Sequence, residues 1–168
     1  MNETAGGIGR KPPKIVRLAR MRRGDWLLLV EATITLAIAR LIVTTRPPGQ
    51  LASRLGRPLA GDAPPFSPIA SDSVRAGRVG WAIRCAAANV PFRAMCFEQA
   101  LAARAMLDRR GIPGVIHYGV APDLDGGLLA HAWTDVAGQP ITGYPLRLAF
   151  REIARFVPDR LGERDVRR

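Results

Sequence analysis

The hydrophobic period of the sequence changes at Ile112-Pro113, and this change limits the fold to one that combines helices with a small sheet. Before it, apolar residues recur at helical spacing across Phe97–Leu107. After it, Val115–Ala121 and Leu128–Val136 alternate as two strands joined by a turn-rich segment, and Gln139–Thr142 reads as a short third strand. We therefore predict an α+β fold, in which a helix lies against a small antiparallel sheet.

The front of the chain reads as helical. Residues 1–13 lack periodicity and are rich in Gly and Pro, so we expect a disordered tail. Lys14–Arg23 is a candidate basic amphipathic helix, followed by a break at Gly24-Asp25. Asp25 is the expected N-cap of an apolar helix over Trp26–Thr45, which stops before Arg46-Pro47.

A proline-rich stretch separates this front part from the rest. After a short helical turn over Gln50–Gly56, four prolines fall within Pro58–Ser71, and a helix over Ser73–Ala88 follows with Ser71 or Asp72 as its cap. The chain is thus expected to have four parts. These are the tail (1–13), an N-terminal helical region (14–57), a Pro-rich loop (58–71) and the main domain (72–168).

The charge of the chain is strongly basic. There are 25 Lys and Arg against 14 Asp and Glu, a formal net charge of +11 over 168 residues, concentrated near both ends. A zinc-ligand cluster and an aromatic–glycine RNA motif are both missing from the sequence, and aromatic residues make up only 6%. We therefore expect no nucleic-acid partner, and interpret the charge as a solvated basic surface or a surface for an acidic peptide.

The apolar segment Trp26–Thr45 is about as long as a membrane span. It carries Glu31 and Arg40, and each charge near the middle of a span costs roughly 2.5–3.5 kcal/mol. We expect a core helix or a helix that faces a partner, with membrane association and a true span as the alternatives. The first residues lack the apolar stretch of an export signal, so we expect a cytoplasmic protein.

Cys96 and His131 form the candidate catalytic pair. Cys96 begins the predicted helix, where unpaired backbone N–H groups and the helix dipole favour the thiolate. His131 follows 35 positions later, in the middle of a predicted strand that would hold its ring rigidly (131 − 96 = 35). A thiol at a helix start beside a histidine on a strand suits nucleophilic acyl transfer.

The other candidate residues have simpler interpretations. Cys85 lies in mid-helix among alanines and is interpreted as core packing, and His117 on the neighbouring strand can also approach the site. Glu98 and Gln99 follow Cys96 and are either cap-related polar residues or oxyanion donors. Two histidines and two cysteines at these spacings do not form a metal-ligand set, so we expect no metal and no cofactor.

The segment CFEQALAARAMLDRRGIPGVIHYGV, followed by AHAWTDVAGQPITG, resembles the C-terminal half of the lasso-peptide biosynthesis leader peptidases. The front part, with its WLLLVEA…ARL helix, resembles the N-terminal helical region of the same family. The resemblance implies a transglutaminase-like, papain-like cysteine-protease core with Cys96 as nucleophile and His131 as base. It also implies three partners: a precursor peptide, a separate leader-binding protein and a lasso cyclase.

The sequence departs from the family pattern at the triad acid. That acid usually lies about a dozen residues after the histidine, where this chain has Gly143. Asp135 is on the same strand as His131, but four residues of strand place their Cα atoms roughly 13 Å apart. Thr142, a backbone carbonyl or a more distant carboxylate such as Asp123 or Asp125 remain the alternatives.

The tryptophan of the HAW motif has two interpretations. Trp133 is expected on the same strand face as His131. It has either a role at the site, where it shields the imidazole or lines the peptide groove, or a role in core packing alone. The sequence thus predicts a cysteine peptidase that removes a leader. A different transglutaminase-like acyl transferase and an inactive peptide-binding member of the fold are the alternatives.

Overall fold

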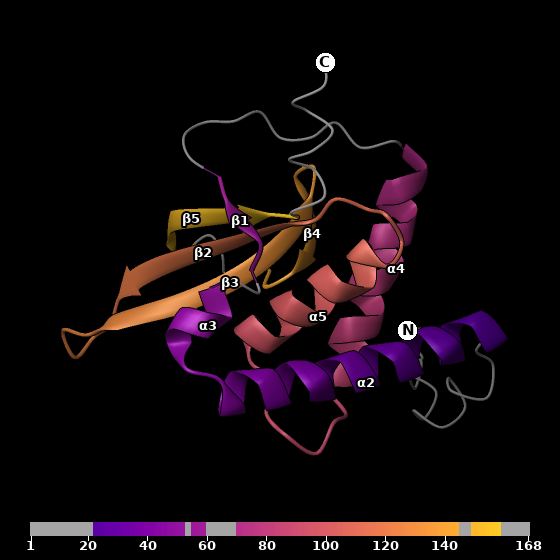
Figure 1. Ribbon diagram of the computed structural model, residues 1–168, viewed down its shortest axis with the longest axis horizontal. Coiled ribbons are helices and arrows are strands. Elements are labelled where there is room, and N and C mark those ends of the chain that lie inside the picture. Colours follow the sequence, from indigo (N-terminus) through magenta and orange to yellow (C-terminus); the bar gives the residue numbers. More distant parts are fainter. Residues whose placement is uncertain (1–21, 53–54, 60–69, 145–148, 159–168) are drawn as a thin grey trace, which may run out of the picture.

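The computed structural model describes residues 22–52, 55–59, 70–144 and 149–158. It has an α+β fold in which helices lie beside a five-stranded antiparallel sheet (Figure 1). The helices are α2 (Arg23–Thr45), α3 (Pro48–Ala52), α4 (Ala70–Ala87) and α5 (Cys96–Asp108). The strands are β1 (Arg57–Pro58), β2 (Val115–Pro122), β3 (Leu128–Val136), β4 (Gln139–Thr142) and β5 (Arg151–Val157).

The sheet has the order β1-β5-β2-β3-β4, so the long β2–β3 hairpin forms its centre. Within this hairpin His117 is paired with Trp133, and Gly119 with His131. Strand β4 is paired only with residues 134–136 of β3. Among the described residues, the part of β3 that carries His131 therefore has a neighbouring strand on one side only.

Most predicted elements are confirmed. Helix α5 begins at Cys96, and β2, β3 and β4 lie where the alternating patterns predict them. The predicted helical turn appears as α3 over Pro48–Ala52, and α4 begins at Ala70, ahead of the cap expected at Ser71 or Asp72. Strands β1 and β5 were not predicted. Residues 1–13, most of the Lys14–Arg23 segment and most of the 58–71 loop lie outside the described residues.

The expected break at Gly24-Asp25 is wrong, because α2 begins at Arg23 and continues through both residues. Asp25 lies in the first turn, where a carboxylate is favoured by the positive end of the helix dipole. Its Oδ1 also accepts a hydrogen bond of 2.6 Å from Arg78 of α4. Both interactions stabilise Asp25 inside the helix, and the N-cap is Arg22 instead.

Small buried residues let the helices pack closely around α5. Helix α5 contacts β2, β3 and β4 on one side, while α2 and α4 pack against it and against each other. Ala100, Ala102 and Ala103 of α5 are fully buried, and Gly80 of α4 lies so near β4 that a Cβ there would be 2.6 Å from the carbonyl oxygen of Ile141. The core is therefore shared by α2, α4, α5 and the sheet.

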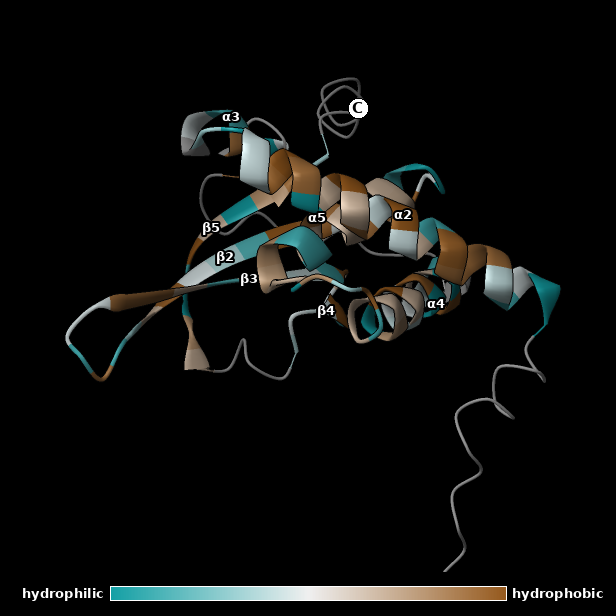
Figure 2. Cartoon of the chain, turned by 90° about the horizontal axis from the view of Figure 1, so that it is seen from below, coloured by the Kyte–Doolittle hydropathy of each residue, from teal (hydrophilic) through white to brown (hydrophobic). Residues whose placement is uncertain are grey.

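Helix α2 is apolar on two faces. Its inner face supplies Leu28, Ala32, Leu36 and Ala39 to the core. Its outer face exposes an apolar surface along the helix, visible in brown in Figure 2, made of Leu27, Val30, Ile34, Ile38 and Leu41. Among the described helices, α2 is also long and apolar enough to cross a membrane by length and composition. Its inner face packs against α4 and α5, as expected of a core helix, while its outer face is left exposed.

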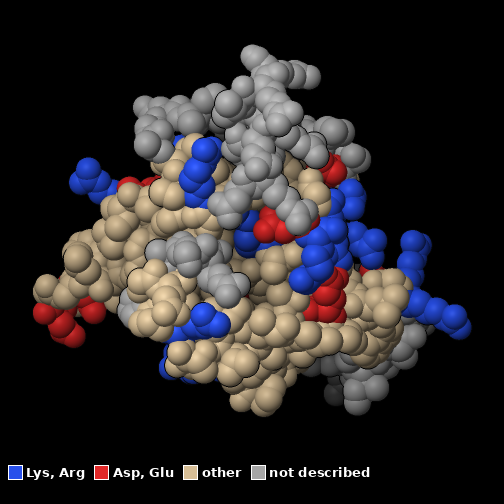
Figure 3. Space-filling view, in the orientation of Figure 1, with Lys and Arg blue, Asp and Glu red and all other residues tan. Residues whose placement is uncertain are grey.

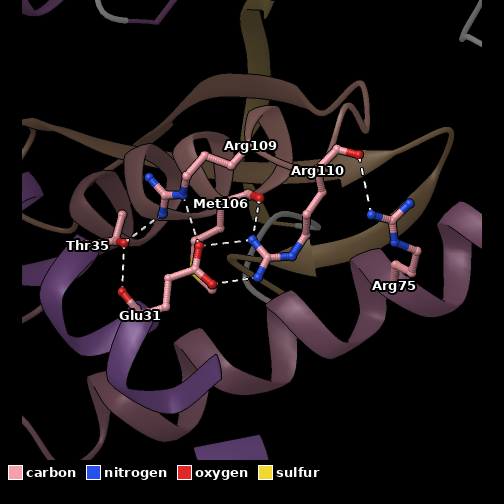
Figure 4. Close-up of polar contacts among 6 residues, drawn as sticks. All are labelled: Glu31, Thr35, Arg75, Met106, Arg109 and Arg110. Carbon is pink, nitrogen blue, oxygen red and sulfur yellow. Dashed lines mark hydrogen bonds and ion pairs between the residues drawn. The ribbon is translucent and has the colours of Figure 1, made fainter. Parts of the chain in front are cut away.

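Glu31 of α2 binds the C-terminal end of α5 through two arginines (Figure 4). Its carboxylate accepts hydrogen bonds from Arg110 at 2.5 and 3.0 Å and from Arg109 at 2.9 Å. Arg109 also donates to Thr35, one turn further along α2, and Arg110 to the carbonyl of Met106. The hydrogen bond from Arg110 lowers the pKa of Glu31, and that of Arg110 is raised in return.

Replacement of Glu31 by Gln should destabilise the fold in a pH-dependent way. Because the pKa of Glu31 is lowered in the folded state, its stabilising contribution is present above the ordinary value of 4.5 and is lost as the pH falls through the folded value. We expect Glu31→Gln to lower the free energy of unfolding by about 1–2 kcal/mol at pH 7, measured by urea denaturation.

The difference between the two proteins should shrink below pH 4.5. Asp72→Asn is the matched control, since Asp72 makes only a 3.6 Å pair with the half-exposed Arg75 one helical turn away. It should cost no more than about 0.5 kcal/mol. An equal loss in both variants, or a loss that does not depend on pH, would contradict this role of Glu31.

Candidate active site

Cys96 is the first residue of α5 and has a half-buried free thiol. Met95 before it has extended backbone angles (φ −73°, ψ 174°) and supplies no side-chain cap. The first backbone N–H groups of α5 are thus not engaged by the side chain of Met95, and they add to the positive end of the helix dipole. The position of Cys96 places its thiol at the positive end of the helix dipole and gives an oxyanion a nearby N–H donor.

His131 lies on β3 and is only 4% exposed. Its ring packs between Phe150, with ring centroids 4.9 Å apart, and Trp133, at 6.0 Å. Its Nε2 is 2.8 Å from the carbonyl oxygen of Gly143. Since a carbonyl oxygen can only accept a hydrogen bond, Nε2 carries the proton and the lone pair of the neutral ring is on Nδ1. Nδ1 is therefore the ring nitrogen that can accept a proton.

Gly143 occupies the place where the family pattern has its acid, and its backbone takes over the orienting contact. The residue has a left-handed backbone (φ 80°). A Cβ at this position would lie 2.5 Å from the Cβ of Trp133 and 2.7 Å from the carbonyl oxygen of Ala132. A carboxylate therefore cannot be accommodated here without displacing β3. Of the alternatives that the sequence left open, the structure places a backbone carbonyl at His131.

A cavity of about 400 Å³ joins the two candidate residues. It is bounded by α3, α5 and the sheet, and Cys96 and His131 both line it. The other lining residues are apolar except for one tyrosine: Leu51, Leu55, Phe97, Tyr118, Ala130, Ala132 and Phe156. Both predicted residues thus line one apolar cavity, although no contact among the described residues joins the thiol to the imidazole.

The two residues reach this cavity from different sides of β3. Ala132 packs with Ala100 and Leu101 of α5, so strand alternation directs the neighbouring His131 ring to the opposite face, together with Trp133. The ring is hydrogen-bonded to Gly143 and not to Cys96. A direct proton transfer between the two side chains would therefore need the imidazole to reach around the edge of β3 that β4 leaves open. Catalytic hydrogen bonds commonly tighten only in the substrate complex.

Asp135 lies beside His117 instead of His131. Its Oδ2 is 2.7 Å from Nε2 of His117, although the ring N–H is not aligned with it as in a hydrogen bond, while Nδ1 of His117 is 2.9 Å from Glu152 of β5. The His117 ring is also stacked on Trp133, with centroids 5.3 Å apart and planes at 2°. Trp133 thus lies on the face predicted for it, between the two histidine rings. The carboxylates on this face belong to His117.

The remaining predicted residues lie apart from the His131 ring nitrogen. The hydroxyl of Thr142 is buried and has no hydrogen-bond partner among the described residues. Asp123 binds the backbone of its own turn at the end of the β2–β3 hairpin, through Leu124. Gln99 donates to the carbonyl of Ala94, and Glu98 is bound by Arg40. Within the described residues, no group of three or more His, Cys, Asp or Glu side chains is arranged to hold a metal ion.

The comparison with known families agrees with this architecture. The model of the transglutaminase-like superfamily matches residues 32–155, which is well over half of the chain. The chain belongs to the transglutaminase-like superfamily. The matched region of this transglutaminase-like protein runs from α2 into β5 and contains both Cys96 and His131. No curated protein and no solved structure matches the chain.

Gly143 and Gly138 provide a matched test of the crowded position beside His131. Both have φ of 80°, but a Cβ at Gly138 would meet nothing within 4 Å. Gly138→Ala should therefore cost only the backbone penalty of about 1–2 kcal/mol. Gly143→Ala should cost about 2–5 kcal/mol, because the clash with β3 is added, measured by chemical denaturation. Equal losses would show that Gly143 is not constrained by the strand beneath it.

Proposed function

We propose that this chain is a cysteine peptidase that removes the leader from a ribosomally synthesised lasso-peptide precursor. The observation that supports this most directly is the shared cavity. It has a thiol at a helix N-terminus, and a histidine whose Nε2 proton is held by the Gly143 carbonyl. The family membership supports a possible cysteine hydrolase or transferase. The choice of a lasso-peptide leader as substrate rests on the resemblance of the CFEQALAARAML and HAW segments to the leader peptidases.

The reaction would proceed in two steps. Cys96 Sγ attacks the carbonyl of the scissile peptide bond, and Nδ1 of His131 accepts the thiol proton. The backbone N–H of Cys96 donates to the oxyanion. The tetrahedral intermediate collapses when the C–N bond breaks, and His131 protonates the amine of the departing core peptide. A water molecule, deprotonated by His131, then hydrolyses the thioester, which releases the leader acid and restores the thiol.

The contact between His131 and Gly143 bears on the rate of this reaction. A carbonyl dipole fixes the ring tautomer, but it stabilises the imidazolium less than a full negative charge does. The cavity walls are mostly apolar, so the substrate residue next to the scissile bond is expected to present an apolar side chain. Leader cleavage by this site should therefore be slow for a free peptide and should depend on how the precursor is presented.

The outer surface of α2 is the proposed docking site for a separate leader-binding protein. The five apolar residues there, from Leu27 to Leu41, are 51–72% exposed, and Figure 3 shows an uncharged stretch along α2. Exposed arginines, including Arg22, Arg23 and Arg46, lie at its two ends. A partner with an apolar strip and acidic flanks fits this surface, and a lasso cyclase would then act on the freed core peptide. We expect these partners to meet the protein in the cytoplasm, without nucleic acid or stable membrane contact.

One alternative is favoured by a specific observation. Among the described contacts, the only hydrogen bond of His131 is to a carbonyl, and the ring is not bonded to Cys96. A peptide-binding member of the superfamily without catalytic activity would have this same arrangement. A transferase would share the thioester step but pass the acyl group to an amine, so product analysis with an added amine separates it from a hydrolase.

Substitution of the catalytic pair should abolish leader release. We expect Cys96→Ala to remove all cleavage of a lasso-peptide precursor, and His131→Ala to slow it by about 100-fold or more. The assay is mass spectrometry of the peptide products with the leader-binding protein present. Cys85→Ala is the control and should cleave normally, since Cys85 lies on α4 away from the cavity. Normal cleavage by Cys96→Ala would refute the assignment.

A single acidic residue in the apolar surface of α2 should disrupt docking. Deletion of the helix is not informative, because its inner face belongs to the core. Ile34 is 54% exposed near the middle of the outer face, so Ile34→Asp should preserve the fold. We expect it to weaken binding of the leader-binding protein at least 10-fold, since a central apolar contact is typically worth more than about 1.4 kcal/mol.

Val74→Asp on α4 is the matched control for this surface. Val74 is similarly apolar and 69% exposed, but it lies on a different helix. Its binding constant, measured by calorimetry, should equal that of the native protein. Equal binding by the native protein and Ile34→Asp would exclude the outer surface of α2 as the interface.

A further inference from the structure

A buried ion pair connects α2 with the first turn of the nucleophile helix. Glu98 lies two positions after Cys96 and is 1% exposed as a residue. Its Oε1 accepts a hydrogen bond of 2.9 Å from Nη1 of Arg40 on α2. The side chain of Arg40 is 41% exposed, whereas that of Glu98 is 2% exposed. The pair therefore has a buried anion at the active-site end and a cation that solvent reaches from α2.

The charge of Glu98 bears on the ionisation of Cys96. The two residues are separated by two positions of helix, about 3 Å of rise and roughly 200° of rotation, so Glu98 points toward α2 and Cys96 toward the cavity. Their charges therefore act on each other across the end of the helix. The reaction requires a second anion, the thiolate, at the same helix end. A buried carboxylate opposes that second negative charge, and the N-terminal dipole of one helix stabilises both only in part. With Arg40 in place, the carboxylate is neutralised and the helix N-terminus remains available to the thiolate.

Few other charges act on Cys96 from the elements around it. Among the residues that line its cavity, the titratable groups besides Cys96 are Tyr118 from β2 and His131 from β3. Arg93, in the segment before α5, is exposed. No acidic or basic side chain of α3 or β5 is among the lining residues. Among the described ion pairs, Arg40–Glu98 is the one that reaches the first turn of α5.

We propose that Arg40 is a positioning residue for catalysis, which neutralises Glu98 and so permits Cys96 to form the thiolate. The proposal deepens the proposed function, because it rests on Cys96 as the nucleophile. It also gives that site a means of regulation. Because only Arg40 of the pair is accessible, a partner bound along α2 can alter the reactivity of Cys96 by burying Arg40 or by competing for it with a carboxylate.

The test is the pH dependence of Cys96 alkylation by iodoacetamide, followed by peptide mass spectrometry. Four proteins are compared: the native chain, Arg40→Met, Glu98→Gln and the double variant. Arg40→Met should move the midpoint of alkylation up by about one pH unit, a roughly 10-fold lower rate below the midpoint, because Glu98 is left unpaired. Glu98→Gln should lie at or below the native midpoint. The double variant should return close to the native midpoint.

The return in the double variant separates an electrostatic role from a structural one, because loss of packing would not be repaired by a second substitution. Arg78→Met is the matched control. It removes another ion pair of α2, the 2.6 Å contact of Asp25 with Arg78 on α4, and should leave the midpoint unchanged. Circular dichroism establishes that each variant is folded.

Two outcomes would overturn the proposal: an unchanged midpoint in Arg40→Met, or a double variant that labels as slowly as Arg40→Met. Failure of the proposed function gives a different result. In that case Cys96 of the native chain would label no faster than Cys85 at neutral pH, whatever the shift between variants.

Discussion

The close packing of α5 between the sheet and helices α2 and α4 is the contact on which the rest of the structure depends. It is possible because α5 presents alanines at the contacts, and Ala100, Ala102 and Ala103 are completely buried. Larger side chains at these positions would push the helix away from β3. The packing fixes the position of the helix axis and therefore the position of the N-terminus of α5. Cys96 is held at the cavity by the burial of residues one and two turns further along the same helix.

The second constraint acts on the other side of β3. There the rings of His117, Trp133, His131 and Phe150 follow one another, and the chain turns at Gly143 so closely that no side chain fits. Glycine at position 143 means that the acid of the family pattern is absent, but the turn also brings the carbonyl of Gly143 to the imidazole of His131. The carboxylates Asp135 and Glu152 are used on this face to bind His117. The His131 ring is thus held by packing and by one hydrogen bond to a neutral acceptor.

Local pattern predicted the elements that carry the candidate pair. The apolar period after Cys96 and the alternation of Leu128–Val136 each depend on neighbours within a few residues, and both elements formed where expected. Strand β5 was missed because Arg151–Val157 is rich in charge, and its role is set by pairing with β2, more than thirty residues earlier. Similarly, Asp25 was predicted as a cap because its partner Arg78, on a different helix, leaves no local signal.

The contacts that distinguish this site could not be predicted from the sequence, because they join residues far apart in the chain. Arg40 and Glu98 are 58 positions apart, and His117 and Glu152 are 35 apart. The sequence shows that the acid of the family pattern is absent at position 143. It does not show that the carbonyl of Gly143 replaces this acid, because that depends on the left-handed turn and the contact with Trp133. The residue type at position 143 therefore predicted the absence of a carboxylate, while the backbone turn determined that a carbonyl oxygen contacts His131.

The central claim is that Cys96 is a nucleophile activated by His131. Acylation by p-nitrophenyl acetate tests it without knowledge of the natural substrate. The native protein should release a burst of one equivalent of p-nitrophenolate and carry one acetyl group, found on Cys96 by peptide mass spectrometry. The burst should be much slower in a protein that lacks the His131 imidazole. Acetylation of Cys85 and Cys96 at equal rates, or a burst that does not depend on His131, would contradict the account.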